Sequence, residues 1–151
     1  MQQPAPIPRD GIALGYAPMD AIHQEFVDLL AQAACATHAA LPRLLDALQA
    51  HLQAHFDEED RWMTETDFPA RSCHMDEHAA VLRSAAEVRL RLADGDCTLV
   101  RAFIAELARW FPGHAHYLDS ALAHWMCQRQ FGGRPMVFSR QLRVHTAAPA
   151  G

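Results

Sequence analysis

The sequence predicts an all-α fold, an up-down-up-down four-helix bundle with an extended N-terminal arm and a basic C-terminal tail. Two observations predict it. Apolar residues recur every three or four positions over four long stretches, and short segments rich in turn residues separate those stretches. No stretch has the sustained alternation that a pair of strands requires. At 151 residues, 50% of them hydrophobic, the chain is long enough to bury one core.

The first two helices are predicted from their apolar stripes. The first helix begins near Met19 and fades at 37–40, and its stripe consists of His23, Val27, Leu30 and Ala34. Pro42 suits the first turn of the second helix, which breaks at 67–69. Its stripe consists of Leu44, Leu48, Leu52, His55, Glu59 and Trp62.

The third and fourth helices follow the same logic. The third helix spans about 70–93 and stops at the turn signal Asp94-Gly95-Asp96; its inward positions are His74, His78, Val81 or Leu82, Ala85, Val88 and Leu92. The fourth spans about 97–128, before the glycines at 132–133. Its predicted stripe consists of Phe103, Leu107, Trp110, His114, Leu118, Leu122 and Trp125.

Both ends of the chain differ from the bundle at 19–128. Residues 1–18 carry four prolines and form the predicted arm. The tail, 129–151, holds four arginines and no acid. It is interpreted as a solvated tail, with a docking segment as the alternative, in which 135–138 (Pro-Met-Val-Phe) would supply the apolar contact. No protein partner of the tail is predicted.

Composition excludes several classes of function. The net charge of −5 argues against nucleic acid as a partner. No apolar run is long enough to span a membrane, and the N-terminus lacks the pattern of a signal peptide, so a cytoplasmic location is expected. The cysteines form no closely spaced pair and are expected to be free thiols: Cys35, Cys73, Cys97 and Cys127.

Histidines and carboxylates on the inward stripes predict a metal site. The pairs His55–Glu59 and His74–His78 are four residues apart, so each pair leaves its helix on one face. Taken singly, an inward histidine is more often a hydrogen-bonded core residue than a ligand. Jointly they favour metal, because each buried polar group without a partner costs about 1–3 kcal/mol. A nitrogen-rich site without cysteine, and without the Glu-x-x-His motifs of ferritin-like proteins, suits two iron ions.

Four motifs resemble those of the bacterial hemerythrins, in order over roughly 10–128. They are Met19-Asp20-Ala21-Ile22-His23-Gln24, then His55-Phe56-Asp57-Glu58-Glu59 followed by Met63 and Phe68-Pro69, then His74 through His78, and finally Trp110-Phe111-Pro112-Gly113-His114 with Asp119. The resemblance implies that His74, His78 and His114 hold one iron and that His23 and His55 hold the other. It also implies that Glu59, Asp119 and an oxo or hydroxo group bridge both.

The same resemblance implies that dioxygen binds at the iron with two histidines. Trp110, Phe111 and Ala115 are the candidates for the wall of the oxygen pocket, with ordinary core packing as the alternative for the two aromatic residues. His114 and Asp119 are five residues apart, about 140° around an ideal helix. Both reach one cluster only if the cluster is wide or the helix is distorted, and a local kink is expected at Pro112.

The expected function is reversible binding of dioxygen, for storage, delivery or buffering, without catalysis. An oxygen or redox sensor using the same two irons is the first alternative, kept open by the basic tail. An enzyme that consumes peroxide or nitric oxide at this centre is the second alternative.

Overall fold

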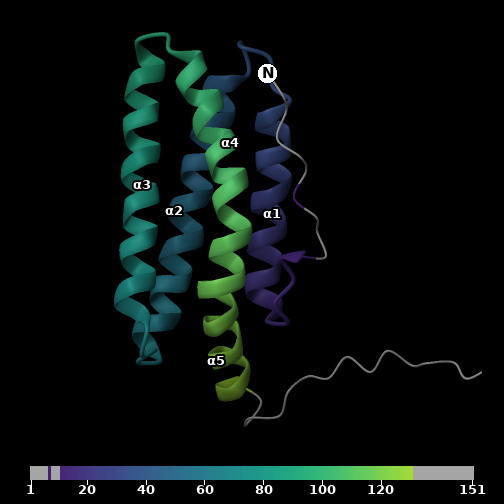
Figure 1. Cartoon of the computed structure of the whole chain (residues 1–151), viewed down its shortest axis with the longest axis vertical. Coiled ribbons are helices and arrows are strands. Elements are labelled where there is room, and N and C mark those ends of the chain that lie inside the picture. Colours follow the sequence, from purple (N-terminus) through teal and green to yellow (C-terminus); the bar gives the residue numbers. More distant parts are fainter. Residues whose placement is uncertain (1–6, 8–10, 131–151) are drawn as a thin grey trace, which may run out of the picture.

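Helical rods make up the structure, a computed structural model that describes residue 7 and residues 11–130 (Figure 1). Its elements are α1 (Ala17–Ala34), α2 (Leu41–Glu65), α3 (Arg71–Ala93), α4 (Cys97–His114), the π-helical turn η2 (Ala115–Asp119) and α5 (Ser120–Gln130). Helix α5 continues the line of α4, so these last three elements form one rod. The docking segment considered for the tail lies outside the described residues, as do residues 1–6 and 8–10 of the arm.

The rods form an antiparallel bundle in the predicted up-down-up-down order. Helix α1 packs against α2, α2 against α3, α3 against α4, and α4 against α1. The predicted all-α bundle is therefore confirmed. None of the helices between residues 17 and 130 is long and apolar enough to cross a membrane.

Local sequence signals explain where the helices begin and turn. Prolines occupy the first turns of α1 and α2, where a missing N–H costs nothing. The carboxylate of Asp96 accepts the N–H of Leu99 at 3.0 Å and so caps the start of α4. Gly95 takes a left-handed φ of 88° in the turn before it.

The core consists of two apolar clusters. The larger, which we call the upper core, includes Phe26, Leu48, Leu52, Phe56, Ile104 and Phe111. The smaller, the lower core, consists of Tyr16, Met19, Trp62, Met63, Phe68, Leu122 and Ala123. The polar residues singled out in the sequence lie between these two clusters along each rod.

The inward stripe of the fourth rod differs from the predicted one. Val100, Ile104 and Phe111 face the core, whereas Phe103 and Trp110 are half-buried at the boundary with α3. The prediction was right for Leu107, His114 and Leu122. It was off by one position at two places, because apolar residues are adjacent at 103–104 and 110–111. The spacing of apolar residues alone does not show which of two adjacent apolar residues faces the core.

Candidate metal centre

Seven polar side chains from the four rods meet between the upper and lower cores. All seven are buried, with at most 3% of any one exposed. Helix α1 contributes His23, α2 contributes His55 and Glu59, α3 contributes His74 and His78, α4 contributes His114, and η2 contributes Asp119. The structure thus brings together every residue that the sequence singled out as a metal ligand.

These seven residues form two overlapping groups. The three-histidine group consists of His74, His78, His114, Glu59 and Asp119, and the two-histidine group consists of His23, His55, Glu59 and Asp119. Within each group the potential ligand atoms all lie within 4.8 Å of one another. The two carboxylates are common to both groups, and this is the arrangement that a pair of neighbouring cations requires.

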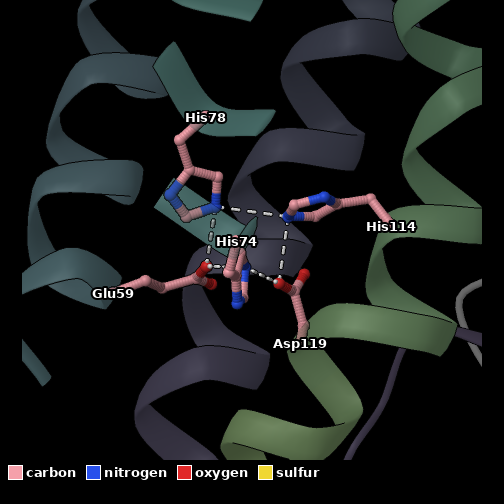
Figure 2. A group of neighbouring side chains, drawn as sticks. All are labelled: Glu59, His74, His78, His114 and Asp119. Carbon is pink, nitrogen blue, oxygen red and sulfur yellow. Dashed lines mark hydrogen bonds and ion pairs between the residues drawn. The ribbon is translucent and has the colours of Figure 1, made fainter. Parts of the chain in front are cut away.

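Glu59 turns one oxygen toward each group. Its Oε1 lies 2.9 Å from Nε2 of His55 and 3.4 Å from Nε2 of His23. Its Oε2 lies 3.3 Å from Nε2 of His78 and 3.5 Å from Nε2 of His74 (Figure 2). The carboxylate therefore sits as a bridge between the groups.

The two carboxylate oxygens of Asp119 also face different groups. Its Oδ2 lies 3.1 Å from Nε2 of His23, and its Oδ1 lies 3.0 Å from Nε2 of both His74 and His114. Figure 2 shows Asp119 and Glu59 approaching the three histidines from opposite rods.

A π turn makes the position of Asp119 possible. The N–H of Ser120 donates to the carbonyl oxygen of Ala115, five residues earlier, instead of four. Five residues then span one turn, so His114 and Asp119 share a face. The distortion expected from the sequence is present, and its hydrogen-bonding change lies at 115–119, after Pro112, which remains within α4.

Charge and hydrogen bonding show that the cluster suits cations. Burial lowers the pKa of His23 and of His74, but the nearby carboxylates of Asp119 and Glu59 outweigh it and raise each pKa to about 9. Burial also raises the pKa of Glu59, yet its histidine partners hold that pKa well below the usual value. Several buried atoms still lack a hydrogen-bond partner among the described residues, including Oε2 of Glu59, both carboxylate oxygens of Asp119 and Nε2 of His74. Cations would satisfy these oxygens and nitrogens together.

Two outer carboxylates, Asp60 and Glu77, were missed in the sequence. Asp60 Oδ1 lies 2.7 Å from Nδ1 of His78. Glu77 Oε2 lies 2.8 Å from Nδ1 of His114, and its Oε1 accepts the indole N–H of Trp110 at 3.2 Å. The sequence held only a weak signal: each acid directly precedes or follows a ligand position, in Glu59-Asp60 and Glu77-His78, but so does Glu58.

The candidate pocket residues lie on different sides of the centre. The ring of Phe111 is fully buried and packs edge-on to His23, with centroids 5.1 Å apart. Ala115 is buried in the same upper core. Trp110 instead lies beside the three-histidine group, 4.4 Å from the ring of His114. Phe26, which the sequence did not single out, packs against His55 at 6.0 Å and Phe111 at 4.8 Å.

Together the bundle and its buried cluster define a four-helix protein with an interior site for cations, built from histidines and two shared carboxylates. The chain belongs to the hemerythrin family, since the model of the "Hemerythrin HHE cation binding domain" matches residues 14–125.

A curated relative supports the same assignment. The chain is 42% identical over 120 residues to a bacteriohemerythrin of Ralstonia nicotianae (strain ATCC BAA-1114 / GMI1000). The match covers 80% of this chain and 88% of that protein. No solved structure matches the chain.

Proposed function

We propose that the chain is a non-haem di-iron protein that binds dioxygen reversibly. Glu59 and Asp119 would bridge the two irons, together with an oxo or hydroxo group. The three-histidine group would hold one iron, and His23 and His55 the other. Two irons at this position would supply a redox-active pair that can share electrons with a diatomic ligand.

The observation that carries the proposal is the unequal number of donors. The three-histidine group offers five ligand residues and the two-histidine group offers four. Iron commonly takes six ligands, so the smaller group leaves more room for a further one. A small uncharged molecule is the ligand that a buried position of this kind admits most easily.

Aromatic side chains close off the same side of the centre. Phe111 and Phe26 are fully buried and pack against His23 and His55. Their rings exclude water from the two-histidine group and offer an apolar wall to an apolar ligand. Ala115, buried in the same cluster, adds a small apolar side chain. These residues would favour holding dioxygen over exchanging it for water or anions.

The experiment that tests the proposal measures iron per chain and the visible spectrum before and after exposure to oxygen. We expect two irons per chain, a charge-transfer band that appears with oxygen, and loss of the band under vacuum. His74→Ala should lose much of the iron while keeping its helical content. A metal-loaded protein with no spectral response to oxygen would contradict the proposal.

The same measurement separates the remaining alternatives. Turnover of peroxide or nitric oxide, without a stable oxygen complex, would point to an enzyme. A change in partner binding on deletion of 129–151 would point to a sensor. We favour reversible binding because the donor set is rich in nitrogen and has only two carboxylates, which stabilises high-valent iron less than a carboxylate-rich site does.

A further inference from the structure

Every histidine of the centre turns its Nε2 atom toward the shared carboxylates, so its Nδ1 atom points outward. The partners of the outward nitrogens differ between the two groups. In the three-histidine group, Nδ1 of His78 meets Asp60 and Nδ1 of His114 meets Glu77. The Nδ1 atom of His74, the third histidine of this group, is buried without a hydrogen-bond partner among the described residues. In the two-histidine group, the Nδ1 atoms of both His23 and His55 are buried and have no hydrogen-bond partner among the described residues.

An outward carboxylate changes a histidine in two ways. It accepts the Nδ1 proton, so the lone pair is fixed on Nε2 and faces the metal position. Its negative charge also makes the imidazole a stronger donor to a cation. His78 and His114 receive both effects, whereas His23 and His55 receive neither from a carboxylate.

The two outer carboxylates are themselves held in place. Glu77 spans the boundary between α3 and α4, since its second oxygen accepts the indole N–H of Trp110. Asp60 reaches from α2 to α3. Their side chains are 38% and 28% exposed, so both lie at the edge of the bundle while the atoms that contact histidine face inward.

We propose that Asp60 and Glu77 are positioning residues that make the two halves of the centre unequal, so that the three-histidine group binds its iron first and releases it last. This inference rests on the proposed function, because it takes iron as the ion. It goes further in assigning an order of loading, with a one-iron protein as an intermediate whose ion lies between α2, α3, the fourth rod and the two shared carboxylates.

Anaerobic titration of the metal-free full-length chain with Fe²⁺, monitored by calorimetry, tests the order in which the two groups bind iron. The wild type should show two steps of different affinity. Asp60→Asn and Glu77→Gln should each weaken the tighter step by roughly 10-fold or more and leave the weaker step unchanged. A merely structural loosening would weaken both steps alike. Far-ultraviolet circular dichroism checks that each variant keeps its helices.

Two further variants complete the design. Glu106→Gln is the matched control. Glu106 on α4 lines the same surface groove as Glu77 on α3, but it pairs with Arg109 and contacts no histidine in the part of the chain that the structure describes. It should leave both steps unchanged. His23→Ala should keep the tighter step and lose the weaker one.

The outcomes separate the two proposals. Protein that takes up no iron overturns the proposed function and this inference with it. Protein that takes up two irons in equal steps overturns this inference alone. So does a Glu77→Gln variant that weakens both steps alike, or a His23→Ala variant that loses the tighter step.

Discussion

The carboxylate of Asp119 lies 3.0 Å from Nε2 of His114, although the two residues are five positions apart on one continuous rod. In a regular α-helix they would be separated by about 140°. The π turn at 115–119 removes that angle. The centre therefore depends on one extra residue in a single turn.

Inserting one alanine after Tyr117, which is exposed and lies within this turn, should rotate Asp119 out of the centre by about 100°. Iron per chain should fall, and the lower core should be disturbed because Leu122 and Ala123 rotate as well. Asp119→Asn is the matched variant, which removes the charge without changing the register. An insertion variant with full iron content would show that the register of Asp119 is dispensable.

Glu59→Gln should weaken the binding of both irons, because the two oxygens of Glu59 face different groups. His55→Ala should weaken only the iron of the two-histidine group, since the imidazole of His55 approaches only one oxygen of Glu59. Iron analysis after dialysis against a chelator checks both. Equal losses in the two variants would contradict the bridging role of Glu59.

Phe111→Ala should destabilise the fold by about 3–5 kcal/mol, as expected when a buried ring leaves a cavity. It should also shorten the lifetime of the oxygenated protein, because water would reach His23. The decay of the visible band gives the rate. Leu48→Ala is the control, a buried change in the upper core that costs about 2–5 kcal/mol. Equal decay rates in both variants would assign the effect to stability alone.

Iron affinity should rise with pH between about 6.5 and about 9. In the metal-free protein the pKa values of His23 and His74 are raised from 6.5 to about 9, so both rings hold protons at neutral pH that iron must displace. The same shifts stabilise the metal-free fold fully below pH 6.5, and that contribution is lost as the pH rises through 9. Calorimetry in buffers of different ionisation enthalpy counts the released protons. Uptake without proton release would contradict this.

Much of the fold followed from the sequence, because the helical spacing of apolar residues and the turn residues between the stretches indicate the same helix boundaries. The third helix was predicted over 70–93 and spans Arg71–Ala93. The first begins at Ala17, two residues before the predicted start, since Pro18 fits its first turn. The apolar pattern could not say whether Phe103 or Ile104 faces the core, since that depends on packing against α1 and α3.

The convergence of the five histidines and Glu59 also followed from the sequence, because they lie on the predicted inward stripes. Asp119 lies off the predicted stripe and was placed with them only through the resemblance to the hemerythrins. Their role as iron ligands stays a prediction, as do the cytoplasmic location, the absence of a nucleic-acid partner and the limits of the arm and tail. Asp60 and Glu77 were missed because the sequence pattern of a partly exposed acid near a metal site is the same as that of any other surface acid. Only the spatial approach of their oxygens to His78 and His114 distinguishes them.

The separation of the two apolar clusters by a polar layer affects how the molecule holds together. Each cluster is held together by close packing of apolar side chains, whereas the polar layer between them is stabilised only as far as its charges are matched. Without cations, α5, the turn at 66–70 and the segment at 14–16 are anchored mainly by the smaller cluster and should open at a lower free energy than the other end. With cations bound, ligands from all four rods are tied at one level, and the two ends melt as one. The supply of metal therefore decides whether the chain unfolds in one cooperative transition or in two.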